Sequence, residues 1–230
     1  MTRHIGIVAC SAEGAALCYR TICTEAPRLM GRYAHPEVTM HTHSLADYMR
    51  AIEADDGERV AELMVSSAKK VASVGAEFAI CPDNTIHQAF DLAVKQSPIP
   101  WLHIAEVVAE EAKRRDYRYL GVLGTRYLME GPVYPGRLSA AGIKHRIPEK
   151  ADRERINEII FDELVAGIFT DASRTYFAEV IGKLKNEGCD AVVLGCTEIP
   201  LLITQKDSPL PVLDSTRLLA RAALRKAISE

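Results

Sequence analysis

The sequence predicts an α/β protein made of two pseudosymmetric, doubly wound lobes, each built around a parallel sheet. Two observations lead to this fold class. Short apolar runs alternate with longer segments of helical periodicity along the 230 residues of the chain. In addition, three segments of the first half recur in the same order in the second half. Repetition of this kind indicates two copies of one supersecondary plan.

The internal repeat consists of three pairs of segments. They are IGIVACS at position 5 with LGVLGTR at 120, GAEFAICPDNTIH at 75 with GCDAVVLGCTEIP at 188, and PIPWLH at 98 with PLPVLD at 209. The two members of each pair lie 111 to 115 residues apart. We assign residues 1–103 plus 212–230 to an N-terminal lobe and residues 104–211 to a C-terminal lobe.

Each expected element follows from a local pattern. Apolar runs that end in small or polar residues predict buried parallel strands at 5–9, 78–81, 120–123 and 191–194. Apolar residues at helical spacing predict a helix over 58–74, a matching helix that ends before Gly188, and a linking helix over 104–115. Strands and helices that alternate in this way imply parallel sheets covered on both faces.

Composition limits the kinds of partner. The net charge is −3 and there is no basic run, so no electrostatic footprint for nucleic acid or for an anionic membrane is present. No apolar run approaches the roughly 20 residues that a membrane span requires. The N-terminus leads directly into the first predicted strand and leaves no room for a signal peptide, so we expect a cytoplasmic protein.

The cysteine and histidine patterns do not predict a metal site. The six cysteines form no CxxC pair, and His35, His41 and His43 have no matching cluster in the sequence. We therefore expect no metal, and we expect Cys18, Cys23 and Cys189 to be inert, buried thiols.

Polar residues follow the predicted strands at the edge where ligands bind. Ser11, Asp83, Thr125 and Cys196 each come directly after a strand. In open parallel sheets, ligands bind just beyond the carboxyl ends of the strands. Asp83 and Cys196 are equivalent in the repeat, because each lies eight residues after the glycine that opens its segment. Two facing lobes would present these two side chains from opposite sides of an active-site cleft.

Several longer motifs resemble those of one enzyme family. The segments are LGCTEIPLLI around Cys196, GVLGTRYLMEGPVY, INEIIFDELVAGIF and PVLDSTRLLARAAL. They resemble the aspartate/glutamate racemase superfamily, whose members are cofactor-independent and have two pseudosymmetric lobes. The resemblance extends over nearly the whole chain. The first motif of the family is Cys-Asn-Thr followed by His, whereas DNTIH in this chain has Asp83 at the cysteine position.

The resemblance implies an amino-acid racemase or epimerase that removes the α-proton on one face and returns a proton on the other. Neither pyridoxal phosphate nor metal takes part. Cys196 would supply one acid–base group and Asp83 the other. The reference pKa values of Cys and Asp differ by about 4.6 units, or roughly 6 kcal/mol. Burial can raise the pKa of a carboxyl group by up to about 3–5 units. Asp83 could therefore act as base or acid, or it could only cap a turn, and Cys81 is an alternative second base.

The remaining site residues are expected from the motifs to bind substrate. The α-carboxylate and the amine would be bound by Ser11, Asn84, Thr85, Thr125 and Thr197. Glu198 would tune or accept protons, or would cap the following helix, and a helix start after Cys196 would favour its thiolate. His43 would contact substrate or would be a polar surface residue.

Thr170 stands where aspartate racemases commonly have a lysine for the distal carboxylate, which weakens aspartate as the substrate. The resemblance also implies a homodimer.

Two other classes of function remain open. One is a lyase, decarboxylase or cis–trans isomerase that uses a single cysteine on the same scaffold. The other is a non-catalytic protein that binds a small molecule.

Overall fold

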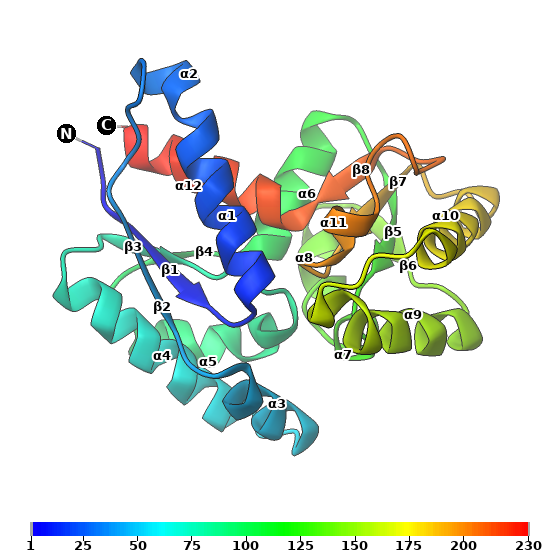
Figure 1. Ribbon diagram of the computed structural model, residues 1–230, viewed down its shortest axis with the longest axis horizontal. Helices are drawn as coiled ribbons and strands as arrows, with labels where there is room; N and C mark the ends of the chain where they lie inside the picture. The colour runs from blue at the N-terminus through cyan, green and yellow to red at the C-terminus, as the bar shows by residue number, and fades with distance from the viewer. Residues whose placement is uncertain (1, 230) are drawn as a thin grey trace. The chain divides into compact units, whose positions relative to one another are not determined.

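The computed structural model describes residues 2–229 and separates into two compact units. The first unit runs to Val107 and resumes at Thr216, and the second unit is Val108–Ser215. Each unit is an α/β structure with its own four-stranded parallel sheet, which confirms the predicted fold class (Figure 1). Within residues 2–229, no helix combines the length and the apolar character that a membrane crossing requires.

The sheet of the first unit has the strand order β2-β1-β3-β4. All of its strands are parallel, so their carboxyl ends lie at one edge. Ile5 of β1 is aligned with Phe78 of β3, and Ile7 is aligned with Ile80. The strands are β1 (Ile5–Ala9), β2 (Val38–Thr42), β3 (Phe78–Ile80) and β4 (Trp101–Leu102).

Helices cover both faces of this sheet. Figure 1 shows α4 and α5 on one side and α1 and α12 on the other. The ion pair between Glu25 and Arg221 joins α1 to α12. The elements are α1 (Ala12–Glu25), α2 (Pro27–Met30), α3 (Leu45–Glu53), α4 (Gly57–Ser73), η1 (Thr85–Ala89), α5 (Phe90–Gln96) and α12 (Ser215–Ile228). Helix α6 (Ile104–Arg114) contains the boundary between the two units.

The sheet of the second unit has the strand order β6-β5-β7-β8, again with every pair parallel. Its strands are β5 (Tyr119–Leu123), β6 (Lys144–Arg146), β7 (Ala191–Leu194) and β8 (Val212–Asp214). Its helical elements are α7 (Arg126–Met129), α8 (Pro135–Ala140), α9 (Lys150–Asp162), η2 (Leu164–Ala166), α10 (Asp171–Asn186) and α11 (Ile199–Leu202).

The repeat seen in the sequence corresponds to a repeat in topology. The first strand of each unit lies between the second and third strands, and the fourth strand pairs with the third. The helix before the third strand ends in the same way in both units. Gly75 and Gly188 have φ angles of 103° and 94°. The residue after each glycine donates its N–H to the helix carbonyl five residues earlier. This is the Schellman pattern, for which glycine at the left-handed position is favoured.

A second glycine in each unit lets a helix approach the central strand closely. A Cβ atom placed on Gly6 of β1 would lie 2.7 Å from Cγ2 of Val71 on α4. A Cβ atom on Gly121 of β5 would lie 2.8 Å from Cδ1 of Leu184 on α10. Both distances are shorter than a carbon–carbon contact, so the absence of a side chain at these positions sets how closely each helix packs on its sheet.

We expect Gly121→Ala to destabilise the second unit by about 1–3 kcal/mol, because the added methyl group overfills the contact with α10. The matched control is Gly182→Ala in α10, where a Cβ atom meets nothing within 4 Å. That change should stabilise the helix by about 0.5–1 kcal/mol, because alanine has the higher helix propensity. Urea denaturation followed by circular dichroism measures both changes. Equal midpoints for Gly121→Ala and the wild type would contradict the packing account.

Candidate active site

The segment after β3 contains the candidate acid–base residue of the first unit. Asp83 is half-buried, and the adjacent Asn84 is buried. The Oδ1 atom of Asp83 accepts a hydrogen bond of 3.1 Å from the Ile86 N–H in η1. The carboxylate therefore does cap a turn, one of the roles considered for it. The same bond fixes the position of the carboxylate, while the residue remains partly open to solvent.

Cys81 is poorly suited to act as the second base. Its side chain is fully buried, and burial raises the pKa of its thiol. The neighbouring Asp83 carboxylate raises that pKa further. Both effects oppose formation of the thiolate, which is the form of cysteine that accepts a proton.

Two further candidates of the first unit follow β1 and β2. Ser11 is the N-cap of α1, and its Oγ accepts a hydrogen bond of 3.3 Å from the Gly14 N–H. His43 follows β2, and its Nε2 lies 3.1 Å from the Ser66 Oγ of α4. Burial lowers the pKa of His43, and the charge of Lys70 lowers it further. The hydrogen bond identified for His43 thus joins it to α4 rather than to the segment after β3.

In the second unit, Cys196 belongs to a buried polar cluster. Its Sγ lies 2.9 Å from the Glu198 Oε2 and donates a hydrogen bond to it. The Thr197 hydroxyl donates to the same carboxylate oxygen over 2.8 Å. All three residues are buried, and Glu198 is only 3% exposed. A buried carboxylate is costly unless it is hydrogen-bonded, so the thiol and the hydroxyl together stabilise Glu198 in this position.

Two glycines bring the segments after β5 and β7 together. The Gly195 N–H donates to the Leu123 carbonyl over 2.7 Å. A Cβ atom on Gly124 would lie 3.2 Å from the Gly195 carbonyl oxygen and 2.6 Å from a methyl group of Leu128. Thr125, directly after Gly124, is the N-cap of α7 and accepts the Leu128 N–H over 3.2 Å. The candidates Thr125 and Cys196 therefore come from segments in direct contact.

The helix expected after Cys196 is present but short. It is α11, with only four residues. A single turn gives little macrodipole, so the helix start contributes little to stabilising a thiolate, contrary to the expectation from the sequence. Glu198 is the N-cap residue of α11, but its side chain makes no capping hydrogen bond. Its carboxylate binds Cys196 and Thr197 instead, so the helix-capping role considered for it is not observed.

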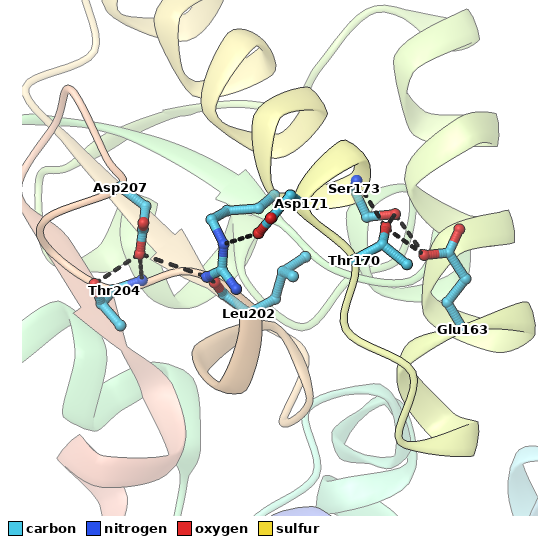
Figure 2. Close-up of polar contacts among 8 residues, drawn as sticks. Glu163, Thr170, Asp171, Ser173, Leu202, Thr204 and Asp207 are labelled. Carbon is cyan, nitrogen blue, oxygen red and sulfur yellow. Dashed lines mark hydrogen bonds and ion pairs between the residues drawn. The ribbon is translucent and has the colours of Figure 1, made fainter.

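Thr170 caps α10. Its Oγ1 accepts a hydrogen bond of 3.1 Å from the Ser173 N–H, and both hydroxyls contact Glu163 Oε2. Figure 2 shows Thr170, Ser173 and Glu163 joined in this network. Helix capping thus accounts for the threonine at this position.

Arg174 connects α10 to the segment that leaves α11. Its guanidinium donates to the Leu202 carbonyl at the end of α11. It also forms ion pairs with Asp171 and Asp207, at 3.6 and 3.8 Å. Asp207 in turn accepts hydrogen bonds from the N–H and hydroxyl of Thr204, and these bonds lower the pKa of Asp207 (Figure 2). The network anchors the far end of the chain segment that begins with Cys196.

Two of the three cysteines that were expected to be buried are buried. Cys18 and Cys189 are buried, whereas Cys23 is only partly buried, which corrects the prediction for that residue. Cys23 lies on the half-exposed side of α1, where helical spacing alone could not place it. Across residues 2–229, no three His, Cys, Asp or Glu side chains gather in an arrangement that could hold a metal ion.

Two features of the site were not identified from the sequence. The first is the direct bond between Cys196 and Glu198, because a spacing of two residues does not show which way each side chain points. The second is His87, whose imidazole bonds the backbone of Asp83. The spacing of four residues between Asp83 and His87, across a predicted turn, is a signal that could have suggested this contact.

The family can be assigned by comparison with known proteins. A family model described as Asp/Glu/Hydantoin racemase matches residues 7–223. The chain belongs to this family. Its motifs around Asp83 and Cys196 lie inside the matched region.

Solved structures and a curated relative agree with this assignment. A Yersinia pestis protein described as a candidate Asp/Glu racemase is 32% identical, with a TM-score of 0.90 over 99% of this chain and 100% of that chain. An aspartate racemase homologue from Pyrococcus horikoshii OT3 is 27% identical, with a TM-score of 0.85 over the whole of both chains. The broad specificity amino-acid racemase RacX of Bacillus subtilis (strain 168) is 22% identical over 74% of this chain and 73% of its own length.

We expect Glu198→Gln to speed alkylation of Cys196 by iodoacetamide at neutral pH by about tenfold or more. The carboxylate holds the thiol proton and its negative charge opposes a neighbouring thiolate, whereas the amide does neither. Peptide-resolved mass spectrometry distinguishes Cys196 from the other five cysteines. The control is Glu163→Gln, which removes a carboxylate bonded to Thr170 and Ser173 instead. Equal alkylation rates in Glu198→Gln and Glu163→Gln would show that Glu198 does not control the thiol.

Proposed function

We propose that this protein is an amino-acid racemase or epimerase that moves the Cα proton with Cys196 and Asp83, without pyridoxal phosphate. The observation that carries the proposal is the buried hydrogen bond between the Cys196 thiol and the Glu198 carboxylate. Membership of the racemase family supports the reaction class. We also propose that the protein is a homodimer, which light scattering tests. We further propose that it is cytoplasmic, which cell fractionation tests.

The Cys196–Glu198 pair can supply or accept a proton. In one form the sulfur carries the proton and Glu198 is ionised. In the other, Glu198 carries the proton and the sulfur is a thiolate. Both forms have the same total charge, so changing between them moves a proton over the 2.9 Å contact without bringing a new charge into the buried cluster. Donation of the single proton of the pair to a carbanion leaves the pair deprotonated, and the deprotonated pair accepts a proton from Cα in the reverse direction.

Asp83 supplies the complementary step in each direction. With Asp83 ionised and Cys196 protonated, the carboxylate takes the Cα proton and the thiol returns one to the opposite face of the carbanion. The products of that step are a protonated Asp83 and a Cys196–Glu198 pair that has given up its single proton and carries two negative charges. These two groups are the acid and the base that the reverse reaction requires. Each turnover therefore leaves the number of protons on the enzyme unchanged. Proton exchange with water then returns Asp83 and Cys196 to their starting protonation states.

The hydroxyl and amide groups that follow the strands of each unit are suited to an amino acid. Ser11 and Thr125 each accept a backbone N–H bond as N-caps. A hydroxyl that accepts such a bond still carries a donor hydrogen of its own, which suits a carboxylate. We assign the binding of the α-carboxylate and amine to Ser11, Thr125 and the residues that flank the two bases. These flanking residues are Asn84, Thr85 and Thr197.

The range of substrates is proposed to be wide. The Bacillus subtilis relative is a broad specificity amino-acid racemase. In this chain, Thr170 is used to cap α10 and supplies no cation for a distal carboxylate. We therefore propose neutral amino acids as substrates ahead of aspartate. We also propose His43 as a further residue that contacts substrate.

The proposal is tested by incubating the protein with each enantiomer of an amino-acid panel and separating the products by chiral chromatography. The wild type should form the opposite enantiomer with no change in mass. Cys196→Ala and Asp83→Ala should each lower the rate by about a hundredfold or more, because each removes one acid–base group. Cys23→Ala is the control, because Cys23 lies on α1 and contacts Tyr19. A wild type that leaves the whole panel unchanged, or that forms a product of lower mass, would overturn the assignment.

Asp83→Cys should preserve the fold and bring the initial rates from the two enantiomers closer together. A second thiol makes the two acid–base groups chemically alike, whereas a carboxyl and a thiol have reference pKa values about 4.6 units apart. Initial rates measured separately from the L and D forms give the comparison. If the variant is well folded by circular dichroism but its initial rates from the L and D forms differ more than those of the wild type, Asp83 is not the second base.

A further inference from the structure

The imidazole of His87 lies between two backbone groups. Its Nδ1 is 2.6 Å from the carbonyl oxygen of Asp83. The N–H of Ile104 donates to its Nε2 over 3.3 Å. His87 lies on η1 and Ile104 begins α6, so one side chain joins the Asp83 segment to the first turn of another helix. His87 is only 3% exposed; its contact with Ile104 is buried, and its contact with Asp83 is partly buried.

These two contacts specify one protonation state. A backbone N–H can only donate, so Nε2 must present a lone pair to Ile104. A backbone carbonyl can only accept, so Nδ1 must carry the hydrogen that is donated to Asp83. Both bonds are formed together only by neutral imidazole with its hydrogen on Nδ1.

Aromatic neighbours hold the ring in this orientation. Phe90 stacks on His87, with ring centroids 5.2 Å apart and planes within 7°. The ring of His103 meets His87 edge-on, with centroids 4.8 Å apart. His103 is itself fixed, because its Nδ1 accepts the Ala105 N–H over 3.1 Å. Rotation of His87 away from the Asp83 carbonyl would disrupt these contacts.

We propose that His87 is the positioning residue for Asp83, holding its backbone through the Nδ1–H tautomer. The inference rests on the proposed function of Asp83 as an acid–base group. Asp83 is then held at two points, since its Oδ1 accepts the Ile86 N–H and its carbonyl accepts the His87 N–H. Proton transfer to carbon needs the carboxylate within hydrogen-bonding reach of Cα, and a displacement of about 1 Å can cost about a hundredfold in rate.

The kinetic test compares two substitutions of similar polarity. The side-chain amide of His87→Asn can place an N–H near the position of Nδ1 and keep the bond to the Asp83 carbonyl. The longer side chain of His87→Gln reaches the position of Nε2 and keeps only the bond from Ile104. We expect His87→Asn to retain kcat within about fivefold, and His87→Gln to lose about 10- to 100-fold in kcat with little change in KM. Equal losses of kcat in the two variants, or losses confined to KM, would overturn the positioning role.

A second measurement does not depend on activity. In protein labelled with ¹⁵N-histidine, two-bond ¹H–¹⁵N correlation spectra should show His87 Nδ1 protonated and Nε2 unprotonated. The signals are assigned by their loss in His87→Gln. Finding the hydrogen on Nε2 would overturn the inference and leave the proposed function intact. A wild type that is inactive on every amino acid would overturn the proposed function, and with it the positioning role of His87 in catalysis, even if the tautomer is the one expected.

Discussion

The candidate site depends on one physical requirement, which is that a buried carboxylate must have hydrogen-bond donors. Glu198 is almost inaccessible to water, and its identified donors are the Cys196 thiol and the Thr197 hydroxyl. The catalytic thiol of the proposal is thus also part of what keeps Glu198 stable in the fold. Transfer of the Cys196 proton to a carbanion leaves two like charges 2.9 Å apart, so the deprotonated pair readily regains a proton. This coupling is the reason the pair can act as donor in one direction and acceptor in the other.

The two units hold the residues proposed as acid–base groups by different means. Cys196 is controlled through its side chain, by the carboxylate two residues later. Asp83 is held through its backbone by His87, and its carboxylate is steadied by the Ile86 N–H. The duplicated sheet explains why both residues occur at equivalent points, since each follows the third strand of its unit. The different supports fit the different chemistry, because a thiol needs a partner for its proton, whereas an ionised carboxylate needs only to be placed.

Much of the fold could be predicted because it depends on local patterns. Buried parallel strands are continuous apolar runs, and Gly75 and Gly188 mark the helix ends that precede the third strands. The internal repeat also showed that Asp83 and Cys196 occupy equivalent positions in the two halves of the sequence. The supporting contacts could not be predicted in the same way. The bond from Ile104 to His87 joins residues 17 positions apart, and the length of α11 depends on tertiary contacts such as Arg174 with Leu202. Neither leaves a periodic signal in the sequence.

The central claim is that two different groups exchange protons with opposite faces of one carbon. The most direct test is racemisation in D₂O of an amino acid that carries ordinary hydrogen at Cα. The reaction is followed at low conversion by NMR and mass spectrometry. If two acid–base groups act, the product enantiomer carries deuterium at Cα while the remaining substrate still carries hydrogen there. The reason is that the proton removed on one side of Cα is not the one returned on the other. A product that keeps the original hydrogen, or equal deuterium in product and remaining substrate from the start, would contradict the account.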